Sequence, residues 1–103
     1  MLTASRSVPA CVLVVVADEA TRLDSTAVAA KLRARGIATE VSPSAAKYGK
    51  QIRYAQQRGI PFVWFPAQAG GEVRDIRSGV QSPARAGEWT PPPGDLTPRI
   101  TTS

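Results

Sequence analysis

Residues 44–65 read SAAKYGKQIRYAQQRGIPFVWF, and this stretch decides the fold. Its first part predicts an amphipathic helix, because small and apolar residues return to one side at about 100° per residue. That face carries Ala45, Tyr48, Gly49, Ile52 and Ala55. Ser44 is the expected N-cap, since its hydroxyl can accept from a free N–H of the first turn. Gly59 stands where a left-handed C-cap is expected.

The apolar run IPFVWF at residues 60–65 is too short for a helix and too apolar for a surface loop. It predicts a central strand that is covered on both faces. The run CVLVVVA at residues 11–17 has the same character, and residues 21–35 form a helical pattern that ends at Gly36. IATEV at residues 37–41 alternates like a strand. The chain therefore predicts a parallel β-α-β unit, followed by a second helix and a third strand.

The rest of the chain predicts a hairpin and a tail. Residues 66–71 indicate a turn, and residues 72–77 a strand nearer the sheet edge and antiparallel to the third strand. Residues 80–82 indicate a last short strand. We expect a lead-in segment at 1–10, one α/β domain at 11–82, and a Pro-rich tail at 83–103 that docks through Trp89.

Composition narrows the classes of partner. The chain has 103 residues, 43% of them hydrophobic, and a formal net charge of +5. Its isoelectric point is about 10.2. A basic surface favours a polyanionic partner, with nucleic acid ahead of an anionic membrane, and a solvated basic surface without a partner is the alternative. Because no apolar run approaches the length of a membrane span, we expect a cytoplasmic protein.

Several kinds of chemistry are disfavoured by residue type. The chain has no His, which excludes His general bases, His metal ligands and a Ser-His-Asp triad. Its one cysteine, Cys11, opens an apolar run and is expected to be buried and inert. Asp18 and Glu19 follow the first strand, where a Mg²⁺ site of flavodoxin-like type is one interpretation and favourable charge at a helix start is the other. We expect no catalytic residue, metal or cofactor.

The predicted helix carries a basic stripe. Lys47, Lys50, Tyr54 and Arg58 lie opposite the apolar face, and Gln51 and Arg53 lie on its flanks. Cationic side chains contact phosphates, whereas Tyr and Gln can stack on bases or hydrogen-bond to them. The pattern predicts RNA binding, and a Lys- and Arg-rich face that serves only solubility is the alternative.

At this point the motifs resemble the C-terminal anticodon-binding domain of class II aminoacyl-tRNA synthetases, most closely those of histidyl type. The resemblance runs over residues 11–99 and is carried chiefly by KYGKQIRYA at residues 47–55 and RGIPF at residues 58–62. LRARGI at residues 32–37, DIRSG at residues 75–79 and EWTPP at residues 88–92 add to it. It implies a three-layer α/β fold in which a mixed five-stranded sheet is flanked by helices.

The resemblance also implies a role. Such a domain holds the anticodon stem-loop of tRNA, here tRNA(His), for a catalytic domain or synthetase-like protein. By motif position the candidate RNA-binding residues are Lys47, Lys50, Gln51, Arg53, Tyr54, Arg58, Arg74 and Arg77. For Arg53, a structural ion pair with a nearby carboxylate is the alternative.

Motifs that bind ATP and activate an amino acid are absent from these residues, so we expect no ligase activity from the chain by itself. It can be an excised domain, a truncated product or a free-standing paralogue. The alternative function is a protein-interaction or regulatory module that has lost RNA binding. Trp64 or Trp89 would then be its anchors if either is exposed.

Overall fold

The computed structural model describes residues 3–4, 10–67, 70–92 and 100–101. Five strands form one mixed sheet in the order β3-β2-β4-β5-β6. Their bounds are β2 Val12–Val14, β3 Thr39–Val41, β4 Phe62–Ala67, β5 Gly70–Asp75 and β6 Val80–Pro83. β2 is parallel to both β3 and β4, and β5 is antiparallel to β4 and to β6. The predicted mixed five-stranded sheet is confirmed, with IPFVWF supplying its central strand.

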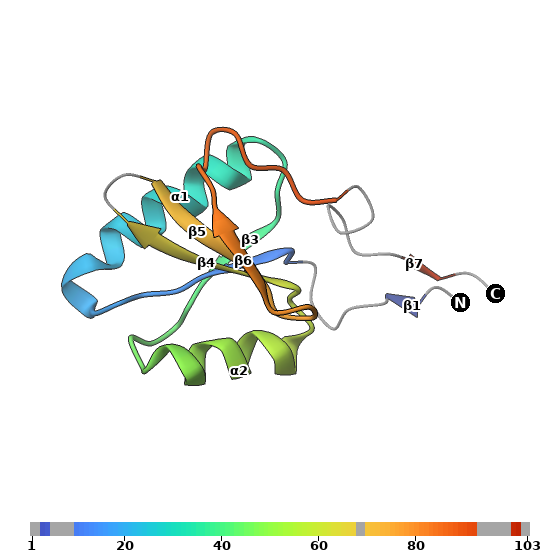
Figure 1. The fold of residues 1–103 in the computed structure, drawn as a ribbon, viewed down its shortest axis with the longest axis horizontal. Coiled ribbons are helices and arrows are strands. Elements are labelled where there is room, and N and C mark those ends of the chain that lie inside the picture. Colours follow the sequence, from blue (N-terminus) through green and yellow to red (C-terminus); the bar gives the residue numbers. More distant parts are fainter. Residues whose placement is uncertain (1–2, 5–9, 68–69, 93–99, 102–103) are drawn as a thin grey trace.

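Helices cover both faces of this sheet, as Figure 1 shows. The short 3₁₀ helix η1 (Glu19–Thr21) leads into α1 (Arg22–Ala34) on one face, and α2 (Tyr48–Arg58) lies on the other. Alternate residues of β2 serve the two sides: Val12 and Val14 join the core beneath α1, and Leu13 joins the core beneath α2. This division explains why the β2 run is apolar at every position, because neither face of the strand meets water.

Both helices end in the same way. Gly36 and Gly59 have φ angles of 83° and 75°, which are costly for residues with a Cβ. The residues that follow, Ile37 and Ile60, turn back to donate to the carbonyls of Leu32 and Ala55. Both isoleucines are buried, so each C-cap also fixes the entry of the next strand into the core.

The start of α2 differs from the prediction. The helix begins at Tyr48, and Lys47 is its N-cap with extended backbone angles and no capping side-chain hydrogen bond. The carbonyl of Ser44 instead accepts from the hydroxyl of Ser42, and that of Ala46 accepts from the Gln51 amide. The prediction of Ser44 as the N-cap was therefore wrong, since these local bonds hold the residues before Lys47 in a non-helical connection.

The hairpin is tighter than predicted. Strand pairing continues to Pro66 opposite Gly71 and to Ala67 opposite Gly70, so most of the predicted turn at residues 66–71 is strand. Beyond β6, residues 86–88 form a turn, and Trp89 packs edge-on against Phe62 and Trp64 with centroids 5.2 and 5.6 Å apart.

The ends of the chain add a two-stranded antiparallel sheet of β1 (Thr3–Ala4) and β7 (Ile100–Thr101). Figure 1 shows this pair beyond the main sheet. The remainder of the predicted lead-in segment, apart from Ala10, and residues 93–99 and 102–103 of the predicted tail lie outside the described residues.

Candidate nucleic-acid interface

Gln51 anchors α2 to the end of strand β2. Its side-chain oxygen accepts from the Val16 N–H at 2.9 Å, and its amide nitrogen donates to the Val16 carbonyl at 2.9 Å. The residue is 2% exposed. Where β2 leaves the sheet, the amide replaces the backbone partners that a neighbouring strand would supply. Gln51 was expected to contact RNA, but its side chain is buried and its hydrogen bonds are used by the protein.

One flank of α2 packs against strand β3. Arg58 forms a 3.0 Å ion pair with Glu40, and the Tyr54 hydroxyl lies 3.5 Å from the same carboxylate. The Arg58 guanidinium also stacks over the Tyr54 ring. The hydrogen bond that Arg58 donates to Glu40 raises the pKa of Arg58. Tyr54 and Arg58 are half-buried. These two members of the predicted basic stripe therefore face strand β3, whereas the sequence placed the whole stripe on the side of the helix opposite the apolar face.

The first half of α2 presents positive charge to solvent. Lys47, Lys50 and Arg53 are all exposed. Among the described residues no ion pair joins any of the three to a carboxylate, whereas Arg22, Arg58 and Arg77 each have an acidic partner. The alternative of a structural ion pair for Arg53 therefore has no support in the part of the chain that is described. These three cations remain available to an external anion.

Tyr48 lies beside these three cations, and the sequence analysis did not identify it as a candidate RNA-binding residue. It is 42% exposed, and its ring meets Phe65 of β4 edge-on with centroids 5.2 Å apart. The sequence placed Tyr48 on the apolar face, but the buried arc of α2 is centred on Gln51 and Ala55. A buried glutamine is the feature that shifts this arc, and the apolar pattern alone does not reveal it.

The two hairpin arginines differ. Arg74 lies opposite Val63, whose side chain is in the core beneath α2, so Arg74 shares that face of the sheet and is half-buried. Arg77 pairs with Asp75 at 2.9 Å and stacks over the Phe62 ring. The hydrogen bond from Arg77 lowers the pKa of Asp75.

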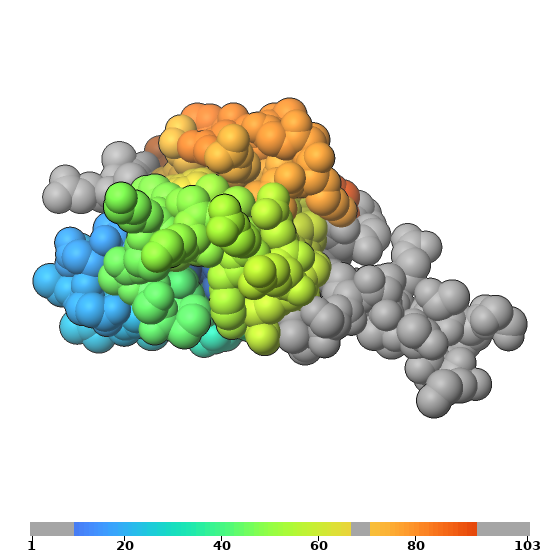
Figure 2. Space-filling view, turned by 90° about the horizontal axis from the view of Figure 1, so that it is seen from below, coloured from blue at the N-terminus to red at the C-terminus, as the bar shows by residue number. Residues whose placement is uncertain are grey.

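Figure 2 shows the face that carries α2, in yellow-green, with the orange hairpin region beside it.

The acidic pair after β2 serves the helix start. Asp18 accepts from the Thr21 N–H at 3.0 Å and caps η1. Glu19 forms a 2.7 Å ion pair with Arg22, and that hydrogen bond lowers the pKa of Glu19. The described residues contain no cluster of three or more His, Cys, Asp or Glu side chains that could hold a metal ion. Favourable charge at a helix start thus explains both acids.

The tryptophans do not offer exposed anchors to a partner protein. Trp64 is completely buried, and Trp89 covers it from the tail side. Cys11 is buried, as predicted. None of the described helices has the length and apolar character needed to span a bilayer.

The mixed sheet, the helix on each face and the exposed basic helix start define an anticodon-binding type of α/β domain. A sequence model of the anticodon binding domain family matches residues 10–65, and the chain belongs to this family. The predicted resemblance is confirmed.

The similar proteins are more specific. Histidine–tRNA ligase of Cutibacterium acnes is 51% identical over 105 residues, covering 96% of this chain and 23% of that protein. The Bifidobacterium animalis subsp. lactis enzyme is 55% identical over 94 residues, covering 86% of this chain and 20% of the relative. Histidyl-tRNA synthetase from Nostoc sp. PCC 7120 shares the fold with a TM-score of 0.70 at 24% identity, over 77% of this chain and 20% of the other.

The chain thus spans about a fifth of the length of these relatives. It corresponds to their anticodon-binding domain, without the catalytic domain.

Proposed function

We propose that this domain binds the anticodon stem-loop of a tRNA, that of tRNA(His) in particular, with the first half of α2. The main observation in support is that three exposed cations have no carboxylate partner in the described part of the structure. They are Lys47, Lys50 and Arg53. Phosphates are the anions that a row of such cations attracts along an RNA strand. The relatives are histidine–tRNA ligases, which favours a tRNA over other polyanions.

In this proposal the contacts divide by chemistry. Lys47, Lys50 and Arg53 pair with phosphates, and Tyr48 offers an exposed ring on which a loop base can stack. Arg74 adds a cation from the neighbouring strand. Tyr54, Arg58 and Arg77 contribute less, because intramolecular partners already hold them, and Gln51 acts through the position of α2.

Catalysis is proposed to lie elsewhere. Because the chain matches only about a fifth of the ligases it resembles, we expect no aminoacylation by this domain alone. A catalytic domain or a synthetase-like protein would act on the tRNA that this domain holds, in the cytoplasm. Because Trp64 and Trp89 pack against each other, no observation favours the alternative of an interaction module that has lost RNA binding.

The test is a fluorescence-anisotropy titration with tRNA(His), a second tRNA and an anticodon-swapped tRNA(His), each at two salt concentrations. The double variant Lys47→Ala, Lys50→Ala should weaken binding to all three and reduce the salt slope by about two units or less. Lys31→Ala with Arg85→Ala removes the same charge from exposed positions outside α2 and is the matched control.

Three outcomes are informative. A preference of the unmodified domain for the histidine anticodon, lost on swapping, supports anticodon binding. Equal binding to all three RNAs that disappears with salt indicates a generic basic surface. If the control pair weakens binding as much as the α2 pair, the assignment to α2 is wrong.

A further inference from the structure

Two buried side chains complete the end of β2, one from each helix. The Ser25 hydroxyl of α1 donates to the Val15 carbonyl at 2.8 Å. The Gln51 amide of α2 accepts from the Val16 N–H and donates to the Val16 carbonyl, both at 2.9 Å. Ser25 and Gln51 are each 2% exposed, and Val15 and Val16 are completely buried. These side chains therefore supply the hydrogen bonds that buried backbone groups require.

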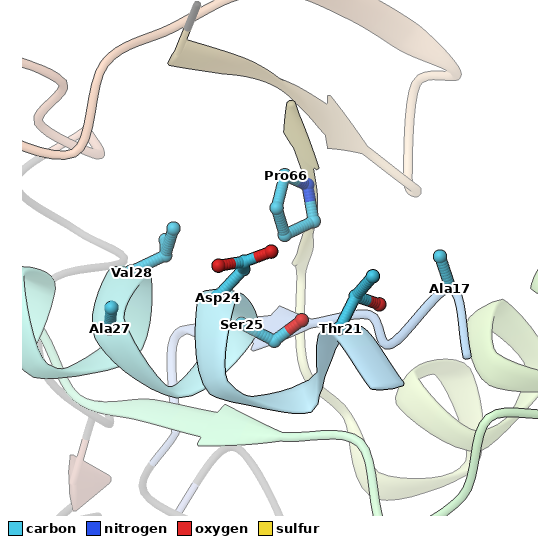
Figure 3. A pocket seen from close by; sticks show the side chains of 7 residues that line it. All are labelled: Ala17, Thr21, Asp24, Ser25, Ala27, Val28 and Pro66. Atoms are coloured by element: carbon cyan, nitrogen blue, oxygen red, sulfur yellow. The ribbon is translucent and has the colours of Figure 1, made fainter. Parts of the chain in front are cut away.

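The sequence leaves this strand end without its regular partner on β4. The Val15 N–H donates to the Trp64 carbonyl, and parallel pairing would next bring the N–H of residue 66 to the Val15 carbonyl. Residue 66 is a proline, which has no N–H to donate. Ser25 supplies the missing donor. Figure 3 shows Ser25 and Pro66 among the residues that line a cavity between α1 and β4.

A single peptide group connects the two hydrogen-bonding side chains. The Val15 carbonyl and the Val16 N–H belong to the same planar unit, and in a trans peptide they point in opposite directions. Ser25 holds one end of this unit and Gln51 holds the other. Because the unit rotates as a whole, losing the bond to Ser25 lets it turn and weakens the bond to Gln51. The position of α2 thus depends on a side chain of α1, on the opposite face of the sheet (Figure 1).

Gln51 in turn fixes the start of α2. Its amide also donates to the Ala46 carbonyl at 2.6 Å, immediately before Lys47. Lys47 is the N-cap and forms no capping side-chain hydrogen bond, so Gln51 is the side chain that ties this connection to the rest of the domain. Lys50 is the residue next to Gln51 in the sequence. Movement of Gln51 therefore displaces two of the three cations that are proposed to contact RNA.

We propose that Ser25 is a positioning residue for the α2 surface and acts through the Val15–Val16 peptide and Gln51. This inference rests on the proposed function. A helix start that is already held in one place presents its cations without further ordering on binding, whereas a loosened start must first be ordered at a cost in affinity. Ser25 itself contacts no RNA in this mechanism, so its effect on binding is indirect.

The first test measures backbone hydrogen exchange by NMR in the domain without RNA. Ser25→Ala should raise the exchange rate of the Val16 N–H about tenfold or more relative to that of the Val63 N–H in β4, which reports opening of the whole core. Thr26→Ala is the matched control, because the Thr26 hydroxyl is exposed and donates to the Arg22 carbonyl of its own helix. This control should leave the ratio of the two rates unchanged. An unchanged ratio in Ser25→Ala overturns the coupling.

The second test measures affinity for the anticodon stem-loop in a double-mutant cycle of Ser25→Ala and Gln51→Met. Each variant should bind about twofold to tenfold more weakly, and the double variant no more weakly than Gln51→Met alone. In the background of Gln57→Met, an exposed glutamine of the same helix, Ser25→Ala should keep its full effect. Urea unfolding monitors the fold of each variant.

Additive effects of Ser25→Ala and Gln51→Met overturn the positioning role, and so does an unchanged affinity of Ser25→Ala. Both results leave the proposed function intact. If the unmodified domain binds no RNA, the proposed function and the positioning role both fail. The exchange measurement still decides in that case whether Ser25 and Gln51 are coupled through the peptide between them.

Discussion

Lys50 and Gln51 are neighbours in α2 with opposite roles. Lys50 is exposed, whereas Gln51 is buried and bonded to both backbone groups of Val16. A buried amide that satisfies a strand end contributes to stability, because leaving that N–H and carbonyl unpaired would cost about 1–3 kcal/mol each. The polarity of a residue type therefore does not by itself assign it to the surface.

Gly71 occupies a position where there is no room for a side chain. An added Cβ would lie 2.7 Å from Trp64 Nε1 and 2.8 Å from the Phe65 carbonyl oxygen. Trp64 is fully buried and has little room to move. We expect Gly71→Ala to lower the free energy of unfolding by about 1–3 kcal/mol, measured by urea denaturation. Gly87→Ala, where nothing lies within 4 Å, is the control, and an equal loss in both would refute the steric explanation.

The candidate site was only partly predictable at this scale. The exposed cations Lys47, Lys50 and Arg53 follow from charge and helical spacing. The roles of Gln51 and Tyr48 do not, because they depend on where β2 ends and on which arc of α2 faces the sheet.

Among the elements, helix ends were predicted better than the start of α2. Gly36 and Gly59 terminate their helices because a left-handed residue is a local requirement that the sequence displays. Ser44 suggested an N-terminus for α2, but the hydrogen bonds in the connection between β3 and α2 override it. The strands followed from continuous apolar runs, and the β4–β5 pairing proved longer than the Gly- and Pro-rich composition suggested.

Arg35, at the end of α1, forms hydrogen bonds with the segment at residues 86–90 that follows β6. One guanidinium nitrogen donates to the carbonyls of Ala86 and Trp89 at 2.8 and 2.7 Å, and the other lies 3.3 Å from the Thr90 hydroxyl. Arg35→Ala should loosen Trp89 and shift its fluorescence to longer wavelength. The expected loss of stability is about 1 kcal/mol, because these bonds are near solvent.

Lys31→Ala, an exposed position on the same helix, provides the comparison for that experiment. The emission shift should be absent in this control. It should also disappear when Arg35→Ala is combined with Trp89→Phe. A shift that persists without Trp89 would instead implicate Trp64, and the tail would not be the element that Arg35 holds.

At the scale of the whole molecule, the sheet joins two cores. β2 and β4 supply side chains to the core beneath α1 and to the core beneath α2. This arrangement was predictable, because uninterrupted apolar strands require cover on both faces. It also implies cooperative unfolding, since neither helix can leave without exposing one face of the same strands to water.

Ile60→Val tests this coupling. Ile60 is 1% exposed in the core beneath α2, and the substitution should cost about 0.5–1.5 kcal/mol. In a Trp89→Phe background, the remaining Trp64 reports on the opposite core. The urea midpoint measured by Trp64 fluorescence should fall by the same amount as the midpoint measured by far-ultraviolet ellipticity. If only the midpoint measured by ellipticity fell, the α2 layer would unfold separately, and the shared sheet would not couple the two cores.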